Sequence, residues 1–232
     1  MTRSILIFII FFLGSCATGR ENIERANAHY RIGLSYFNED KIQMAYVEFQ
    51  KALELNPNDK EVLNALGVVY LRFEDFQKAR ESFLKAITLD PDFSEAHNNL
   101  GVTYGKMGRW SDTLNSFKAA LKNPVYQKPE IAYTGLGEAY YRLGRIDEAI
   151  NAYREAIKRA QDFYRPYYGL ALCYNAKGQY GDAATVIMRA IDLDPIFRGD
   201  RKKLIDDLKN KSPIAKGEEK KDIIDYLEIL RY

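Results

Sequence analysis

The sequence predicts an all-α fold, a right-handed superhelical solenoid made of antiparallel helix pairs. From residue 26 onward, a pattern of small and bulky apolar residues recurs with a period of 34 residues. Within each period these residues follow spacings of three and four, which place them on one stripe of a helix. No segment alternates apolar and polar residues in the way that predicts a strand. Because one helix pair cannot bury its apolar faces alone, neighbouring pairs are expected to stack.

Five copies of the pattern follow one another in phase, over residues 26–59, 60–93, 94–127, 130–163 and 164–197. The first helix of each copy carries a large aliphatic residue, a small residue and a tyrosine at positions 7, 8 and 11. The second helix carries a small residue, a bulky residue and an alanine at positions 20, 24 and 27. This pattern resembles the tetratricopeptide repeat (TPR), and the resemblance implies a TPR array of helices A and B.

Proline marks the end of the second helix in three of the copies. Pro57, Pro91 and Pro195 stand at position 32, where the ring clashes with the preceding turn and offers no N–H. The third copy departs from this, because its joint to the fourth, Asn123 to Pro129, is longer and has prolines on both sides of Tyr126. We expect a stiff extended excursion at this joint, and a simple loop insertion is the alternative.

The first residues read as a lipoprotein signal peptide, residues 1–15. Ile5 to Leu13 is an unbroken apolar run, too short to cross a membrane but of the length of a signal-peptide core. The following Leu-Gly-Ser-Cys resembles the lipobox of bacterial lipoproteins, which implies cleavage before Cys16 and acylation of Cys16 with fatty acids such as palmitate. An ordinary signal peptide with a chance cysteine is the alternative. Residues 16–25 are then the lipidated N-terminus and tether.

The same resemblance indicates which membrane holds the lipid anchor. Ala17 follows the cysteine where many inner-membrane lipoproteins have aspartate. The expected location is therefore exported and lipid-anchored, at the outer membrane facing the periplasm.

Composition argues against several functions. The 34 Lys and Arg residues are interspersed with 32 Asp and Glu residues, so no basic face for nucleic acid is expected. The two histidines, His29 and His97, occupy position 4 of helix A, where packing explains them better than metal binding. Cys173 is interpreted as a small buried apolar residue. We find no catalytic constellation, no metal or cofactor motif and no small-molecule site, and expect no enzyme.

The expected function is protein binding in the concave groove. In TPR arrays, positions 2, 5, 9 and 12 of helix A line this groove. The residues selected as a partner-binding groove are Asn27, Tyr30, Leu34, Phe37, Asn64, Val68, Leu71, Asn98, Tyr141 and Tyr168. Aromatic side chains would supply contact area and the asparagines would bond a peptide backbone. The alternative is that an N-terminal segment or the tail of the same chain fills the groove.

A narrower resemblance comes from the irregular joint together with the lipobox. The stretch NPVYQKPEIAYTGLGEAYYRLGRIDEAINAYREAI, residues 123–157, resembles the corresponding part of PilF/PilW-type TPR lipoproteins, the pilotins of type IV pilus biogenesis. The resemblance implies a partner in the pilus secretin and a role in secretin assembly or stability. Six repeats are described for that family, and five are visible here. A TPR lipoprotein adaptor that recruits peptidoglycan enzymes is the alternative function.

The C-terminal segment, residues 198–232, is expected to form capping helices. Arg201 to Asn210 has few apolar residues, whereas Asp222 to Leu230 is amphipathic. The amphipathic helix either packs on the last repeat, which we favour, or serves as a partner-binding element.

Overall fold

The computed structural model describes the backbone of residues 3–232 and the side chains from residue 20 onward. The expected signal peptide, residues 1–15, and the expected lipidation site at Cys16 therefore lie outside the residues whose side chains are described. Over residues 3–232 the structure contains α-helices and no strand, so the predicted all-α class is confirmed. The chain forms two compact units, residues 1–103 and 104–232.

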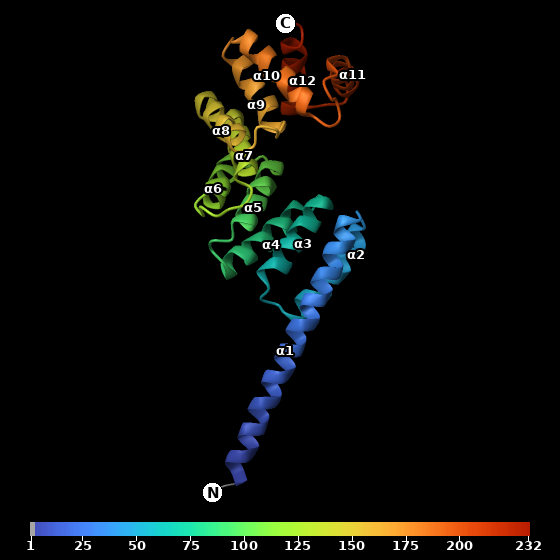
Figure 1. The fold of residues 1–232 in the computed structure, drawn as a ribbon, viewed down its shortest axis with the longest axis vertical. Coiled ribbons are helices and arrows are strands. Elements are labelled where there is room, and N and C mark those ends of the chain that lie inside the picture. Colours follow the sequence, from blue (N-terminus) through green and yellow to red (C-terminus); the bar gives the residue numbers. More distant parts are fainter. Residues whose placement is uncertain (1–2) are drawn as a thin grey trace. The chain divides into compact units, whose positions relative to one another are not determined.

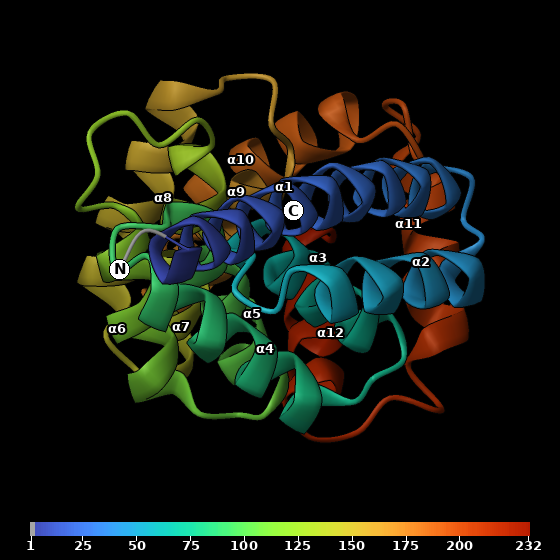
Figure 2. The ribbon, with the colours of Figure 1, turned by 90° about the horizontal axis from the view of Figure 1, so that it is seen from below.

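The first unit contains four helices and most of a fifth. They are α1 (Arg3–Asn38), α2 (Ile42–Leu55), α3 (Lys60–Arg72), α4 (Phe76–Leu89) and α5 (Ser94–Lys106), which runs on across the boundary. Figures 1 and 2 both show α2 beside the C-terminal part of α1, and α3 pairs with α4 in the same way. Residues 16–25, expected to be a tether, belong to α1, the same helix that forms helix A of the first repeat.

The second unit contains the remaining helices. They are α6 (Trp110–Ala120), α7 (Pro129–Arg142), α8 (Ile146–Arg159), α9 (Arg165–Ala176), α10 (Tyr180–Leu193), α11 (Arg201–Lys211) and α12 (Gly217–Ile229). Helices α7 and α8 form one pair and α9 and α10 the next, and α12 packs on α9 and α10.

Close contact between the two helices of a pair depends on the small residue at position 8. A Cβ built on Gly67 would lie 2.4 Å from Cε1 of Phe83, and one on Gly137 would lie 2.6 Å from Cδ1 of Tyr153. Phe83 and Tyr153, both at position 24, are buried. The aromatic ring thus occupies the space that a side chain on the glycine would need, which is why the sequence pairs these residues at fixed spacing.

The ends of the helices follow from local chemistry. Helices α2, α4 and α10 end one residue before Asn56, Asp90 and Asp194, two residues before the prolines, as predicted. The side chain of Asp59 accepts a hydrogen bond from the backbone N–H of Val62 and so caps the start of α3.

The turn between helices A and B holds one residue in the left-handed conformation in every repeat, a feature that the sequence pattern did not predict. This residue is at position 15. It is glycine in the last three repeats, where Gly108, Gly144 and Gly178 have φ of 70°, 72° and 71°. In the first two repeats it is Asp40 and Glu74, with φ of 59° and 58°. Side chains with a Cβ adopt this region at a cost that glycine avoids.

Replacing Glu74 by glycine is expected to stabilise the first unit by about 1 kcal/mol, because the strain at φ 58° is relieved. The reverse change, Gly144→Ala, should destabilise the second unit by a similar amount, since a Cβ there meets nothing within 4 Å and only the backbone is strained. Thermal unfolding of both variants measures this. A lower midpoint for Glu74→Gly would contradict the explanation.

The joint between the third and fourth repeats is not the extended excursion that its prolines suggested. Residues 121–125 form successive turns. The side chain of Asn123 accepts a hydrogen bond from the N–H of Val125 at 3.1 Å, and its carbonyl accepts one from Tyr126 at 3.2 Å. Tyr126 is buried. The correction has a physical reason: an asparagine side chain that bonds the backbone two residues ahead folds the chain into a turn.

Cys173 is fully buried in α9, as interpreted, and burial raises the pKa of its thiol to about 12. At pH 8 only about one thiol in ten thousand is then ionised. In a Cys16→Ser variant, we expect Cys173 to resist an aromatic disulfide reagent in the native protein and to react completely in denaturant. Rapid reaction of Cys173 in the native protein would show that its thiol on α9 is accessible to solvent.

Candidate partner-binding surfaces

One candidate surface lies in the first unit, on α1. Tyr30, Leu34 and Phe37 follow spacings of four and three, so they share a face of the helix. The ring of Tyr30 packs on Phe49 at 5.8 Å between centroids, and Leu34 keeps 37% of its surface exposed. Burial, followed by the charges of Glu61 and of Asp59, raises the pKa of the Tyr30 hydroxyl. Tyr30 and Phe37 pack against the core cluster of this unit and remain partly exposed, as interface aromatics are.

Helix α3 continues this surface. Val68 and Leu71 are half-buried on it. Arg72, in the last turn of α3, lies 5.8 Å from the centre of the Phe37 ring and forms a 2.5 Å ion pair with Asp40. The arginine thereby joins the α3 side of the surface to the α1 side.

The asparagines behave differently from one another. Asn27 is exposed, whereas Asn98 is buried. The Oδ1 of Asn64 accepts a 2.9 Å hydrogen bond from Asn99 of α5, a residue that the sequence reasoning did not select. Among the described residues, the Oδ1 of Asn98 has no hydrogen-bond partner. The Oδ1 of Asn64 is therefore already used within the chain, and its amide NH2 group is what it could offer to a peptide backbone. The Oδ1 of Asn98 could accept a hydrogen bond from a peptide, but it is buried.

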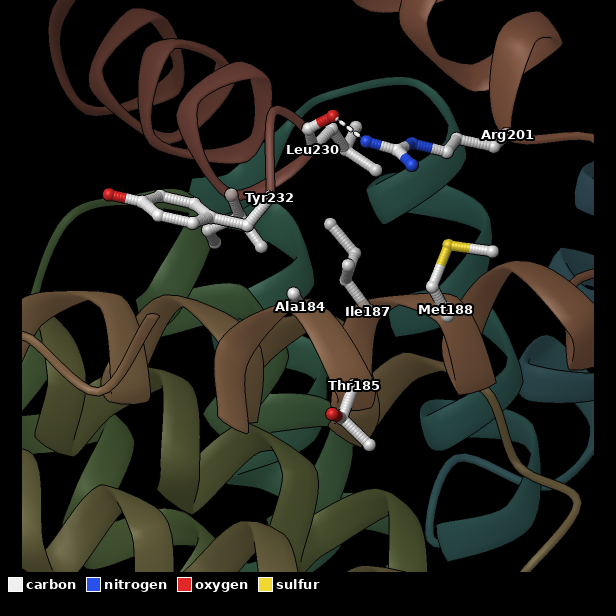
Figure 3. A pocket seen from close by; sticks show the side chains of 8 residues that line it. Ala184, Thr185, Ile187, Met188, Arg201, Leu230 and Tyr232 are labelled. Atoms are coloured by element: carbon white, nitrogen blue, oxygen red, sulfur yellow. Dashed lines mark hydrogen bonds between the residues drawn. The ribbon is translucent and has the colours of Figure 1, made fainter. Parts of the chain in front are cut away.

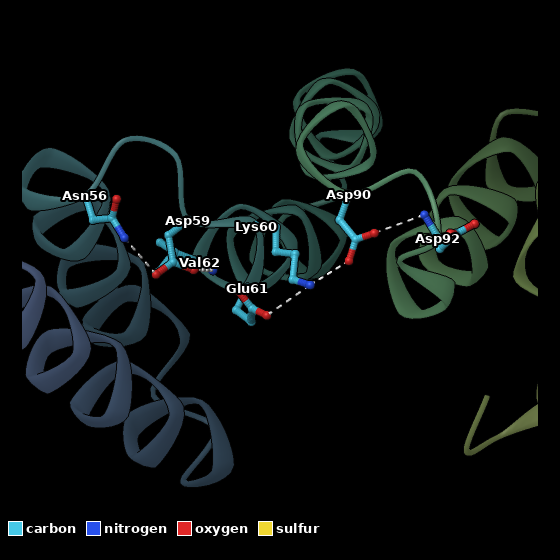
Figure 4. Close-up of polar contacts among 7 residues, drawn as sticks. All are labelled: Asn56, Asp59, Lys60, Glu61, Val62, Asp90 and Asp92. Carbon is cyan, nitrogen blue, oxygen red and sulfur yellow. Dashed lines mark hydrogen bonds and ion pairs between the residues drawn. The ribbon is translucent and has the colours of Figure 1, made fainter. Parts of the chain in front are cut away.

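Polar contacts fix the loops that lead into these helices (Figure 4). The amide of Asn56 donates to Asp59, the residue that caps α3. Lys60, the first residue of α3, forms ion pairs with Asp90 at 2.5 Å and with Glu61 at 3.7 Å. Hydrogen bonds to Lys60 and then to a backbone N–H lower the pKa of Asp90. The start of α3 is thus tied to the end of α4, which holds the α3 face in position.

The second unit presents a different arrangement, because α12 covers its part of the groove. Tyr141 of α7 and Tyr168 of α9 both pack against the core cluster to which α12 contributes. The ring of Tyr168 meets the ring of Tyr226 of α12 edge-on at 5.8 Å, and its hydroxyl donates to Asp194 at 3.3 Å. In this unit the alternative stated above applies: the C-terminal tail of the same chain lies in the groove. With α12 in place, Tyr141 and Tyr168 are only partly exposed, and the ring of Tyr168 is in contact with Tyr226.

An ion pair holds α12 on α7. The Nη1 of Arg142 donates to Oδ1 of Asp222 at 2.8 Å, and Nη2 donates to the second carboxylate oxygen. Only 13% of the Arg142 side chain and 14% of the Asp222 side chain are exposed. The guanidinium of Arg201 donates to the backbone carbonyl of Leu230, just after α12. Bidentate arginine–carboxylate pairs are among the stronger and more directional polar contacts in proteins.

A cavity of about 240 Å³ lies where the end of α12 meets α10. Figure 3 shows Ala184, Ile187 and Met188 of α10 on one side and Leu230 with Tyr232 on the other. The ring of Tyr232 stacks on Tyr180 at 5.2 Å. The pocket is open to solvent, and Ile187, Ile229 and Leu230, which line it, are each at most 4% exposed.

The histidines make local contacts. Nδ1 of His29 lies 2.6 Å from the carboxylate of Glu48, and Nε2 of His97 lies 2.9 Å from the carbonyl of Pro91. Within the described part of the chain, no group of three or more His, Cys, Asp or Glu residues is placed to hold a metal ion. None of the helices in that part combines the length and apolar character needed to cross a membrane.

Comparison with known families defines the class of protein. Models described as tetratricopeptide repeat match residues 26–59, 48–81, 98–162 and 134–195, and one described as TPR repeat matches residues 74–108. Together they span residues 26–195, the larger part of the chain. The chain therefore belongs to the tetratricopeptide-repeat family, whose fold is a protein-interaction scaffold. The comparison with curated sequences gave no match.

Solved structures of TPR proteins share the fold. A crystal structure of PilW, described as a widely conserved type IV pilus biogenesis factor, is 21% identical and superposes with a TM-score of 0.72 over 88% of this chain and 92% of that one. PilF of Pseudomonas aeruginosa is 18% identical, with a TM-score of 0.67 over 87% and 97%. A MamA structure is 28% identical, with a TM-score of 0.61 over 73% and 92%. The PilF/PilW-type resemblance thus extends from the sequence to the fold.

Proposed function

We propose that this protein is a non-catalytic, lipid-anchored scaffold that assists the assembly or stability of a type IV pilus secretin at the outer membrane. The observation that carries the proposal is the partly exposed apolar face of Tyr30, Leu34 and Phe37 on α1, continued by α3. A secretin segment would lay its apolar side chains on this face. Support comes from the fold shared with PilW and PilF and from the irregular joint at residues 123–129.

The anchor is tested at Cys16. In cells fed labelled palmitate, the wild-type protein should incorporate label and fractionate with the outer membrane. A Cys16→Ser variant should lose the label and leave the membrane fraction. Anchoring matters for function because several acyl chains hold a protein stably, at about 0.8 kcal/mol for each buried methylene. Label retained by the variant would refute lipidation at this residue.

The groove is tested by a double substitution, Tyr30→Ala with Leu34→Ala. Truncating two anchor side chains is expected to weaken secretin capture by about tenfold or more, because anchors of this kind each contribute above about 1 kcal/mol. Helicity should remain, since both residues are only partly buried. The measurement is pull-down of detergent-solubilised secretin, with circular dichroism for folding.

The matched control for the groove is Met44→Ala with Val47→Ala on α2. These residues are 53% and 49% exposed and do not belong to the selected groove positions. This control should capture secretin as the wild type does. Full capture by the groove variant would move the binding site elsewhere.

The cellular role is tested by deletion of the gene and blotting for heat-resistant secretin multimers. Their loss, restored by the wild-type protein and not by the groove variant, is the expected result. Unchanged multimers would reject the secretin role. Enrichment of peptidoglycan hydrolases without secretin in the pull-down would indicate the adaptor function instead.

A further inference from the structure

We propose that the second unit carries a separate binding site for an acidic, aromatic amphipathic helix of a partner protein, formed by α7 and α9 and occupied in this structure by α12. The proposal builds on the proposed scaffold function, because it assumes that the protein binds partners. It concerns a different surface from the face of Tyr30, Leu34 and Phe37.

The surface covered by α12 is made of the helix-A positions that line the concave groove in TPR arrays. Tyr168 and Leu172 stand at positions 5 and 9 of the fifth repeat, and Tyr141 stands at position 12 of the fourth. All three belong to or pack against the cluster that contains Ile223 and Ile229 of α12. Helix α12 therefore lies on the same helix-A face that TPR proteins use for their ligands.

The contacts of α12 define what the site recognises. Arg142 supplies a positive charge at one end, which Asp222 engages with two hydrogen bonds. Four residues further on, Tyr226 places its ring edge-on against Tyr168. Ile229, another three residues on, is 1% exposed. An acidic residue followed at i+4 by an aromatic and at i+7 by an aliphatic residue is the pattern of one face of a helix.

Helix α12 is an imperfect ligand for this site. The Nε of Arg142 is buried and makes no hydrogen bond within the described chain, although a carboxylate oxygen of Glu218 lies 3.4 Å away. The cavity of about 240 Å³ at the other end of the helix leaves Ala184 and Met188 of α10 partly exposed. A partner helix with a better-placed carboxylate and a larger side chain at its far end would make both contacts, which α12 does not.

The connection to α12 is short. Residues 212–216 link α11 to α12, and within them Pro213 and Ile214 are exposed, whereas Ala215 is buried in the same cluster as Ile223 and Ile229 and must leave it when α12 is displaced. A short tether gives α12 a high local concentration, so a partner in solution binds more weakly than it would to an open site. Its apparent affinity is reduced by the fraction of molecules in which α12 has left the groove.

The test uses the full chain and a fluorescent synthetic peptide of residues 216–232, with binding followed by anisotropy. Asp222→Lys with Tyr226→Ala in the chain removes the charge pair and the ring contact of the resident α12. This variant should bind the peptide about tenfold or more tightly than the wild-type chain does. Adding Arg142→Ala should abolish the gain. Equal binding by all three proteins would overturn the proposal.

A charge exchange keeps the test decisive if the first variant unfolds. In an Arg142→Glu chain the resident Asp222 is repelled, and a peptide carrying Asp222→Lys should bind while the natural peptide does not. Preference of this chain for the natural peptide would overturn the proposal. Neither assay contains secretin or lipid, so a negative result here leaves the secretin experiment intact, and failure of the secretin experiment does not affect this one.

Discussion

Replacing Phe83 by alanine is expected to destabilise the first unit by about 3–5 kcal/mol, the usual cost of removing a buried aromatic ring. Phe83 is fully buried at position 24 of the second repeat, and its ring fills the space above Gly67. A glycine has no side chain that can move into the void, so the cavity cannot close. Since whole domains are stable by only about 5–15 kcal/mol, this single change should unfold much of the unit near physiological temperature.

The measurement is denaturant unfolding of Phe83→Ala beside Phe73→Ala. Phe73, at the end of α3, is 37% exposed and touches Tyr46 only edge-on at 6.0 Å. Its removal should cost about 1 kcal/mol or less. Similar losses for the two variants would contradict the role assigned to the Phe83 ring packed against Gly67.

Replacing Arg142 by alanine should have the second-largest effect, about 3 kcal/mol in the second unit. The change removes one partner of an ion pair whose side chains are 13% and 14% exposed, and it leaves the carboxylate of Asp222 without its counter-charge. Burial opposes the guanidinium charge, and the hydrogen bonds and charge of Asp222 more than offset this, so the pKa of Arg142 is raised. Hydrogen exchange should show faster opening of α12 than in the wild type.

Arg145→Ala is the matched control for this prediction. Arg145 pairs with Glu148 at 2.8 Å, but both side chains are 46% exposed. Exposed pairs contribute about 0–1 kcal/mol, and salt weakens them further. Unchanged protection of α12 in Arg142→Ala would mean that apolar contacts alone hold the helix.

Much of the fold was predictable because TPR packing depends on residues close together in the sequence. Gly67 and Phe83, or Gly137 and Tyr153, belong to the same helix pair, and their spacing repeats. The left-handed residue at position 15 was missed because this position is glycine only in the last three repeats, at Gly108, Gly144 and Gly178. In the first two repeats it is Asp40 and Glu74, so no glycine repeats through the whole array. The turn at Asn123 was missed because the prolines suggested an extended chain, whereas side-chain hydrogen bonding decided its shape.

The sequence predicted which residues share the groove face of helix A, but it did not predict which of them are accessible to a partner. Sequence position places Tyr30 and Tyr168 alike at position 5 of helix A. The structure leaves the first half-buried on α1 and places the second against Tyr226 of α12. The ion pair that holds α12 joins residues 80 apart in the sequence, and no local spacing signals it.

The sequence by itself determined the class of this protein: helix pairs, their order, the ends of α2, α4 and α10, and the residues that bring the two helices of a pair into contact. The tertiary structure alone decided which of the equivalent positions are covered. Ile32 and Leu66 both stand at position 7, yet Ile32 is 44% exposed and Leu66 is 1% exposed. The physical reason is that a helical stripe follows from spacing along one segment, whereas burial depends on which other segment packs against it.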